Sequence, residues 1–475
     1  MKRYLFKTSL GVFLLGLSLY STLGLGAERV HRYTVTVDDL LTTIKVEACF
    51  EGRPEFALVA ESLDAALALQ SAKIKSTGKK VTPSGKISLH DLGENDCILY
   101  TAAVAYPIMA HDKRSMTIKR VGRDLITAEG IWLWKPDNQP MNDQVLITFD
   151  LPSNITISAP WDIVEDNREH TYLLGNTPYD WPAFVIFGFF PEDHLLVGRA
   201  KIRLAILESK RKIKFKDSIS QGVLSAAEIV SSITGKFPVD DLQMVVEPGA
   251  YGPNAIPIGY VSRGGKPAVH VHINERKHDI FAQDTTLLHE FAHLLLPKIN
   301  DSDSWLTEGL ATYYEYLLAA RSGYKSIRDT VTFFDKNFEV ARLTLPDEPL
   351  SGLSEKRSLR FGREKIYWGG AAIFFVADVK LRVASNDLFS LDDVVSEFNA
   401  CCAKRKNTWS GEEVMHEFDR ISGKKFFSQL YESYVVGNIF PPVENAFDNL
   451  GFEVSGFGQN SGVDRNSKLK LSIFK

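Results

Sequence analysis

Apolar and polar residues alternate along the first part of the chain that follows residue 28. The alternating runs are RYTVTV, TIKVEACF, MTIKRV, DQVLITFD, NITISA and RAKIRLAIL, and Gly, Asn, Asp and Pro separate them. A period of two is typical of strands that bury one face. The pattern predicts a β-sandwich-like domain over residues 28–205, with one helix inserted at FALVAESLDAALALQSAK.

The period changes near residue 215. KDSISQGVLSAAEIVSSITGKF has the spacing of an amphipathic helix, with Asp217 or Ser218 as its N-cap and Gly235 closing it. LQMVVEP predicts a strand, and PIGYVSRGGKPAVHVHIN predicts a hairpin that turns at its Gly-Gly pair.

Helical spacing then dominates to about residue 435. The expected helices cover residues 281–296, 304–320, 328–338, 365–384, 390–402 and 410–434. We therefore expect an α+β chain of several domains. The N-terminal β-rich domain is followed by a mainly helical domain with a small sheet over residues 206–440, and by a short tail over 441–475.

The first 27 residues have the order of a secretory signal. A basic start, MKRYLFK, precedes an uncharged apolar stretch of about 19 residues and then small residues up to Ala27. Ser18, Ser21 and Thr22 dilute this stretch and no basic cluster follows it, so a cleaved signal is favoured over a retained membrane anchor. We expect a periplasmic or secreted protein with no stable membrane span after cleavage.

Composition and cysteine content narrow the picture further. The 475 residues are 44% hydrophobic and 24% charged, which is typical of globular proteins, and the net charge of −4 argues against nucleic acid as a partner. In an exported chain, Cys49 and Cys97 can form a disulfide, but free thiols are an equal alternative. The neighbours Cys401 and Cys402 bond to each other only with strain, so we expect buried or free thiols there.

The segment DTTLLHEFAHLLLPK contains an HExxH motif made by His289, Glu290 and His293. On a helix, residues i and i+4 share a face, so the two imidazoles can bind one zinc ion. The Glu290 carboxylate can reach a metal-bound water and take its proton. Apolar residues surround the three polar ones, which predicts a buried helix ended by Pro297.

A second helix, SWLTEGLATYYEYLLAAR, follows after a short polar loop. Antiparallel packing would bring Glu308 to the two histidines, and two His with one Glu leave a fourth zinc position open, as a catalytic site requires. Thr312 lies on the same face as Glu308, either as a hydrogen-bonding partner behind the ligands or bonded to its own backbone. Further on, Tyr367 precedes Gly369 and Gly370, which permit close backbone approach.

In this order, HEFAH, WLTEGLATYY and IYWGGAAIFFVADVKLR resemble the motifs of the gluzincin metallopeptidases. Those motifs are HExxH, W-x-x-E-G-x-x-x-Y, and Y-x-K-G before an L-D-x-x-x-R helix. The resemblance is nearest to the glycyl-aminopeptidase-like family M61, with the M1 aminopeptidases as relatives, and it covers about residues 240–440. The positions that match are Trp305, Glu308, Gly309, Tyr313, Tyr367, Gly370, Asp378 and Arg382.

The resemblance implies a thermolysin-like catalytic domain with one zinc ion (Zn2+). By this match His289, His293 and Glu308 are the metal ligands. Glu290 is the catalytic base, and Tyr367 is the catalytic donor that stabilises the transition state.

Several departures from the pattern affect the expected specificity. The spacing from His293 to Glu308 is shorter than in M1 enzymes, so the pocket beside it is expected to be more open or differently shaped. Trp368 and Gly369 replace x-Lys in Y-x-K-G. PNAIPIGYVSRGG contains no acidic residue and no G-x-M-E-N, the motif that captures a free amino terminus.

Three further features near the motif have two interpretations each. The segment 256–263 is expected to form an edge strand that pairs with the substrate backbone. His270 and His272 share a strand face, either as ligands or, as we favour, as packed or surface residues. Arg363 either meets a substrate carboxylate or forms a surface salt bridge, and we favour the salt bridge.

Two functions are consistent with the sequence. The first is an exported zinc peptidase that hydrolyses peptide or protein substrates with a Glu-activated, metal-bound water, with aminopeptidase and endopeptidase modes both open. The alternative is an exported binding or scaffold protein with a vestigial metallopeptidase fold. The complete ligand set beside a base argues against the alternative. The sequence does not indicate an oligomeric state.

Overall fold

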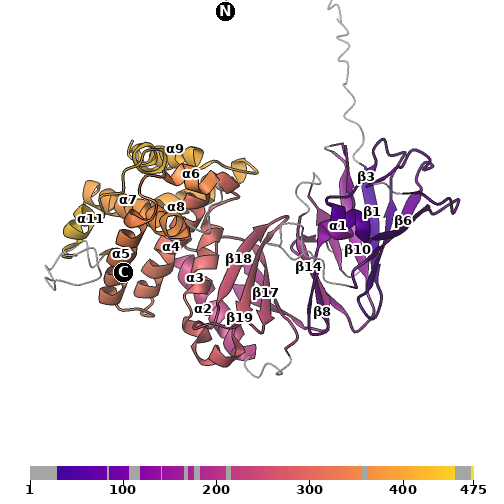
Figure 1. Ribbon diagram of the computed structural model, residues 1–475, viewed down its shortest axis with the longest axis horizontal. Coiled ribbons are helices and arrows are strands. Elements are labelled where there is room, and N and C mark those ends of the chain that lie inside the picture. Colours follow the sequence, from indigo (N-terminus) through magenta and orange to yellow (C-terminus); the bar gives the residue numbers. More distant parts are fainter. Residues whose placement is uncertain are drawn as a thin grey trace, which may run out of the picture.

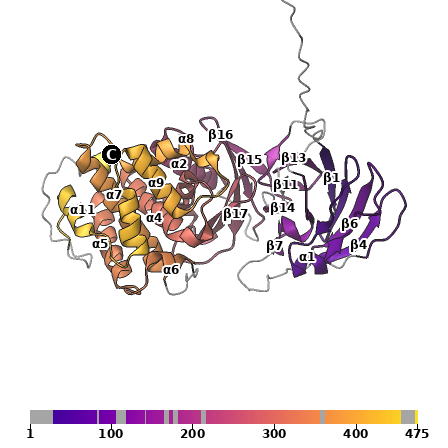
Figure 2. The same ribbon diagram turned by 90° about the horizontal axis from the view of Figure 1, so that it is seen from above.

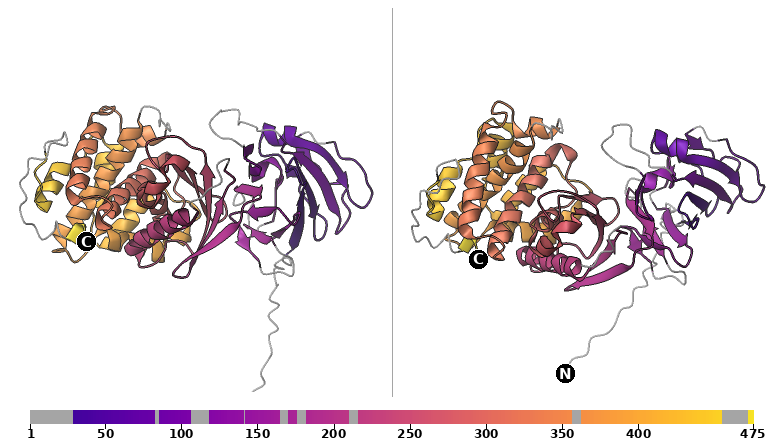
Figure 3. Two further views of the ribbon diagram at one scale, coloured as in Figure 1. Left: turned by 90° about the horizontal axis from the view of Figure 1, so that it is seen from below. Right: turned by 60° about the horizontal axis from the view of Figure 1, so that its bottom comes forward.

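The computed structural model describes most of the chain, and its N-terminal, central and C-terminal parts follow one another along the molecule. The described residues are 29–82, 85–105, 118–140, 142–164, 170–175, 182–209, 216–355, 362–454 and 472–475. The segment interpreted as a signal lies outside them. Figure 1 shows a β-rich module at one end, a helical bundle at the other and a twisted sheet between them. Figures 2 and 3 show the same elongated arrangement from other sides.

The N-terminal module is built mainly from two sheets. The seven-stranded sheet has the order β12-β13-β10-β1-β2-β6-β4 and the four-stranded sheet the order β11-β14-β8-β7. The strands of the larger sheet are β1 (Val30–Val37), β2 (Thr43–Cys49), β4 (Leu69–Ile74), β6 (Cys97–Ala103), β10 (Gln144–Asp150), β12 (Asp162–Ile163) and β13 (Thr171–Leu174). Those of the smaller sheet are β7 (Ile118–Val121), β8 (Asp124–Ala128), β11 (Thr156–Ser158) and β14 (Phe184–Gly188).

A small third sheet and a short helix complete this module. The sheet consists of β5 (Lys86–Ile87), β3 (Leu58–Val59) and β9 (Lys135–Pro136). The predicted inserted helix is reduced to α1 (Leu63–Ala68), capped by Ser62. The residues after α1 are strand β4 instead, because they pair with β6. Long-range pairing therefore overrides the local helical spacing.

A five-stranded sheet with the order β15-β16-β17-β19-β18 forms the middle of the molecule. Its strands are β15 (Glu192–Val197), β16 (Ala200–Ile206), β17 (Asp241–Pro248), β18 (Ile258–Arg263) and β19 (Pro267–Ile273). RAKIRLAIL, which we had grouped with the first module, is β16 and pairs in parallel with β17. The connection between them is α2 (Lys216–Thr234), so Asp217 and Ser218 lie inside this helix and do not cap it. The predicted hairpin is confirmed as β18 and β19.

The remaining helices pack on this sheet and on one another (Figure 1). They are α3 (Thr286–Ala292), α4 (Ser304–Arg321), α5 (Ile327–Leu343), α6 (Leu350–Glu355), α7 (Gly370–Ala384), α8 (Leu391–Cys401), α9 (Gly411–Ser422), α10 (Phe427–Leu430) and α11 (Val443–Leu450). The helix expected over 410–434 is broken at Gly423, which has a φ of 64° and ends α9. The mixed α/β class is confirmed. In the described part of the chain, no helix has the length and apolarity of a membrane span.

The β module and the central sheet are in direct contact. Arg203 on β16 is fully buried, and its guanidinium bonds Asp241 at 2.9 Å and the carbonyl of Ala159 at 2.6 Å. A Cβ added to Gly264 would lie 1.2 Å from the carbonyl oxygen of Pro182, so only glycine fits this contact. These contacts fix the position of the β18–β19 turn against the β module.

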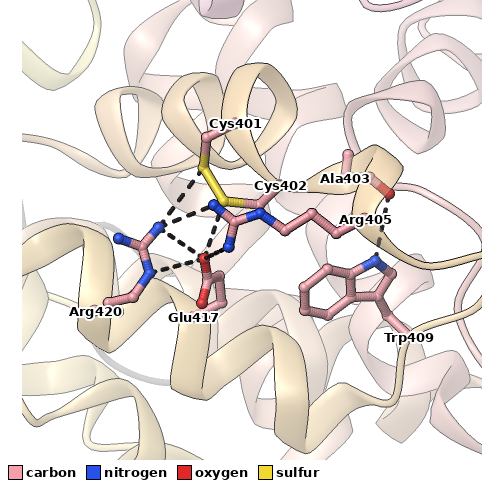
Figure 4. The surroundings of a disulfide bond; sticks show 7 residues. All are labelled: Cys401, Cys402, Ala403, Arg405, Trp409, Glu417 and Arg420. Carbon is pink, nitrogen blue, oxygen red and sulfur yellow. Dashed lines mark hydrogen bonds and ion pairs between the residues drawn. A yellow bond between two sulfur atoms is a disulfide. The ribbon is translucent and has the colours of Figure 1, made fainter. Parts of the chain in front are cut away.

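Both cysteine pairs are disulfide-bonded. Cys49 and Cys97 face each other on β2 and β6 and form a bond, as one of our two alternatives predicted. Cys401 and Cys402 also bond to each other, so the expectation of free thiols there was wrong. This bond lies where α8 ends, beside Glu417 and Arg420 of α9 (Figure 4).

Candidate active site

The polar residues of the HExxH motif lie where α3 ends. His289 and Glu290 are buried in α3, and His293 begins the single 3₁₀ turn that follows it. Leu296 is already extended and Pro297 comes next, so the helix ends where expected. α4 packs against α3 and carries Glu308 in its second turn.

Three potential ligands converge at this point. Oε2 of Glu308 lies 3.3 Å from Nε2 of His289 and 3.6 Å from Nε2 of His293. The three ligand atoms all lie within 4.8 Å of one another. Tetrahedral zinc ligands at about 2.0–2.1 Å from the ion are about 3.3 Å apart. The donor set therefore fits one zinc ion, and the role of these residues as ligands stays a prediction.

Glu315 holds the other side of the His289 ring. Its Oε2 lies 3.1 Å from Nδ1 of His289, and its Oε1 accepts a hydrogen bond of 2.7 Å from Thr285. This contact directs Nε2 of His289 toward Glu308. No sequence motif points to Glu315, although it lies two helical turns after Glu308 on the same helix.

Thr312 does not have either of the roles we considered. Its side chain is buried, and its hydroxyl oxygen has no hydrogen-bond partner among the described residues. It therefore supports neither the candidate ligands nor its own backbone. Glu315, one turn further along α4, makes the supporting contact instead.

The charges in this cluster shift the pKa values of His289 and Glu308 in opposite directions. Burial disfavours a charged imidazole, but hydrogen bonds with Glu308 and Glu315 outweigh it and raise the pKa of His289 to about 10. Burial alone would raise the pKa of Glu308, but the charges of His293 and His289 and a hydrogen bond with His289 outweigh this effect and lower it to about 2. The carboxylates thus hold a positive charge at this point, which a divalent cation would supply in place of the proton.

Glu290 lies beside this cluster, next to the candidate ligand His289. Its side chain is buried, and Oε2 has no hydrogen-bond partner within the described part of the chain. Burial, with smaller contributions from Glu308 and Glu315, raises the pKa of Glu290 to about 7. A carboxylate with this pKa can accept and release a proton near neutral pH.

Tyr367 completes the cluster from a third element. It lies in a π-helical turn, Lys365–Gly369, directly before α7. Its ring stacks on His289 with the centroids 6.0 Å apart, and burial together with the charge of Glu308 raises its pKa. The guanidinium of Arg363 lies 4.9 Å from the centre of this ring. Arg363 therefore packs on Tyr367, and the surface salt bridge that we favoured is not seen among the described residues.

Close helix packing brings Tyr367 to the site. A Cβ on Gly370 would lie 2.3 Å from the carbonyl oxygen of Trp305, and one on Gly309 would lie 2.5 Å from Gly370. The close approach expected at Gly370 is therefore confirmed. At Gly369 the nearest atom is a Leu350 methyl at 3.4 Å, which is an ordinary contact.

Other residues of the motif form a buried network away from the candidate ligands. Tyr313 donates a hydrogen bond of 2.7 Å to Asp378, and Arg382 pairs with the same carboxylate at 3.1 Å. Asp378 also accepts from the backbone N–H of Leu391, so it links α4, α7 and the start of α8. These positions support the arrangement of the helices.

The candidate ligands open into a cleft of about 900 Å³ between the two halves of the molecule. Its lining comes from the β module, from β18 and from α3 and α4. β18 is the edge strand of the central sheet, as expected for the segment 256–263. His270 and His272 lie on the neighbouring strand β19, where His270 is buried and stacks on Tyr260. His270 is thus a packed residue, as we favoured.

The fold of this chain is similar to the folds of several solved structures. The chain superposes on an aminopeptidase N family protein from Idiomarina loihiensis with a TM-score of 0.68 and 12% identity, covering 89% of this chain and 78% of that one. It also superposes on an M1 zinc metallopeptidase from Deinococcus radiodurans with a TM-score of 0.53 and 14% identity, covering 87% and 95%. A mutant of that enzyme with a bound Tyr-Ser-Ala substrate gives a TM-score of 0.54 at 13% identity, with the same coverage.

The chain has the fold of an M1 zinc metallopeptidase. The predicted resemblance to the gluzincins is therefore confirmed at the level of the fold, while assignment to family M61 rather than M1 stays a prediction. The sequence matches no known protein-family profile and no curated protein. The M1 fold is thus recognised in three dimensions at an identity of 12–14%.

Proposed function

We propose that this protein is a zinc-dependent peptidase. The observation that carries the proposal is the convergence of ligand atoms of His289, His293 and Glu308 within 4.8 Å, beside Glu290, whose Oε2 has no hydrogen-bond partner among the described residues. Three protein donors leave one zinc position free for a reactant, as in catalytic rather than structural zinc sites. The M1 zinc metallopeptidases that share the fold support the same conclusion.

His289, His293 and Glu308 would hold the ion. When bound, zinc supplies a Lewis acid that polarises a peptide carbonyl and lowers the pKa of water. Glu290 accepts a proton from the attacking water and then donates a proton to the leaving amine. Tyr367 donates a hydrogen bond to the oxygen that becomes negative in the transition state.

The cleft accommodates a peptide in an extended conformation. β18 lines it from Gly259 to Arg263 and is an edge strand, so its free backbone groups can pair with a substrate backbone. A Cβ on Gly259 would lie 2.6 Å from Oε1 of Glu290, which brings this strand directly against the base. A peptide paired with β18 would therefore pass the candidate zinc position.

Export belongs to the same proposal. Residues 1–27 direct the chain to the periplasm or the outside of the cell and are then removed. N-terminal sequencing of the protein recovered from the periplasm and medium checks this. A mature chain that still begins at Met1 contradicts signal cleavage.

Zinc content and cleavage of a mixed peptide library test the activity. We expect one zinc per chain and cleavage that a chelator abolishes. The Glu290→Gln variant should retain zinc and lose turnover, whereas Glu308→Ala should lose zinc. Tyr367→Phe should keep zinc and lower kcat, and a Glu290→Gln protein that keeps most of its activity would contradict the mechanism.

The binding or scaffold function gives a different result in the same experiment. In that case the protein binds peptides but cleaves none of the library, with or without added zinc. Cleavage of peptides with a blocked amino terminus separates the two enzymatic modes, because an aminopeptidase requires a free amine.

A further inference from the structure

Arg263 ends the edge strand β18 and lines the cleft beside the candidate zinc position. Its guanidinium donates a hydrogen bond to the backbone carbonyl of His293. Among the described residues this is its one hydrogen bond, and no carboxylate pairs with it. Arginine carries five N–H donors and stays charged, so most of its binding capacity is unused.

The side of β18 that carries Arg263 is the side that faces the candidate ligands. Side chains alternate along a strand, so Gly259 and Arg263 share a face. Gly259 lies against Glu290, and Arg263 reaches His293. Tyr260 belongs to the opposite face and stacks on His270. A group bound by Arg263 therefore lies on the same side of a paired peptide as the scissile bond.

Besides the candidate base Glu290 and the candidate ligand Glu308, the acids that line the cleft are Glu61, Glu129 and the exposed Asp301, and none of them lies on β18. β18 and the turn after it contain no Asp or Glu. The carboxylates of Glu61 and Glu129 line the cleft from the β module, but both pair with Lys135, at 3.1 Å and 3.0 Å. The charge that β18 itself brings to the cleft is thus the guanidinium of Arg263, which suits an anionic group.

We propose that Arg263 selects substrates that carry a carboxylate, which its guanidinium binds as the peptide pairs with β18. The proposal rests on the proposed peptidase function and names its substrate class. The carboxylate comes either from an Asp or Glu side chain or from the carboxyl terminus. A guanidinium and a carboxylate form charge-assisted hydrogen bonds with a defined planar geometry.

Peptides that differ in one carboxylate test this proposal. A set of otherwise identical peptides has Glu or Gln at each position in turn, with a free or amidated carboxyl terminus. We expect wild-type kcat/KM to favour Glu over Gln at one position, or the free over the amidated terminus, by about tenfold to hundredfold. The position of the effect identifies the source of the carboxylate. Equal rates throughout the set overturn the selectivity and leave the peptidase function intact.

Two variants of Arg263 and one control variant assign the effect to this residue. Arg263→Gln should bring the ratio of acidic to neutral peptides close to one, and Arg263→Lys should keep part of the preference. Lys298 is an exposed cation that lines the same cleft, so Lys298→Gln is the matched control and should keep the wild-type ratio. Loss of the preference in the control rather than in Arg263→Gln overturns the assignment.

Binding separates this proposal from the peptidase function. Fluorescence polarisation with zinc-loaded Glu290→Gln protein measures the affinity for the same peptides without turnover. The zinc-loaded Glu290→Gln protein should bind the carboxylate peptide more tightly than the neutral one. If the double variant Arg263→Gln/Glu290→Gln loses this difference, the role of Arg263 is supported even if no peptide is cleaved. Equal affinity for the acidic and neutral peptides overturns it, and a melting temperature for each variant shows that it is folded.

Discussion

Nδ1 of His289 lies 3.1 Å from Oε2 of Glu315, on the side of the ring opposite Glu308. This carboxylate fixes the orientation of the imidazole, and such supporting contacts are worth about 10–100-fold in metal affinity. Glu315→Gln should therefore weaken zinc binding by about this factor, as measured by competition with a chromogenic chelator. Glu228→Gln, at an exposed position on α2, is the control. Unchanged zinc affinity in Glu315→Gln would contradict the orienting role.

Gly370 should not tolerate alanine. The added methyl would lie 2.3 Å from the carbonyl oxygen of Trp305 and 2.8 Å from Cα of Gly309, and backbone atoms cannot move aside cheaply. We expect Gly370→Ala to lower the free energy of unfolding by about 1–3 kcal/mol, as measured in urea. Gly369→Ala meets a Leu350 methyl at 3.4 Å and should be close to the wild type. Equal stability of the two variants would disagree with this packing.

Stability should fall in acid because of His270. Burial, with a smaller effect of His272, lowers the pKa of His270 to about 3, whereas the pKa of the imidazole in the unfolded chain is about 6.5. Between these values the unfolded state binds more protons, so the free energy of unfolding falls as pH decreases from about 6.5 to about 3. One proton corresponds to at most about 1.4 kcal/mol per pH unit.

Unfolding measured across this pH range checks the contribution of His270. His270→Gln removes the titrating group and should flatten the dependence. His416→Gln, at an exposed position on α9, should keep the wild-type slope. A slope in His270→Gln as steep as in the wild type would show that other groups cause it.

The two disulfides should differ in their effect on stability. Cys49–Cys97 closes a loop with a sequence separation of 48, whereas Cys401–Cys402 joins neighbours. In the chain-entropy model the first bond contributes about 4 kcal/mol and the second little, because it restricts almost no unfolded chain. We expect the Cys49→Ala/Cys97→Ala double variant to melt well below Cys401→Ala/Cys402→Ala, in calorimetric scans at one rate. The reverse order would contradict the model.

The sequence by itself determined the local features of this protein. Alternating runs located strands such as β1, β2 and β10, and the HExxH spacing placed His289 and His293 on one side of a helix. The hairpin of β18 and β19 followed from its Gly-Gly pair. These features depend on residues a few positions apart, whose relative placement the backbone geometry sets.

Only the tertiary structure decided which distant segments meet. The pairing of β16 with β17 and the contact of Glu315 with His289 were not predicted. The same is true of Arg263, which reaches the end of α3 from the edge of the sheet. Each contact depends on how sheet and helices pack, and local hydrophobic periodicity carries no information about the neighbour across a packed interface.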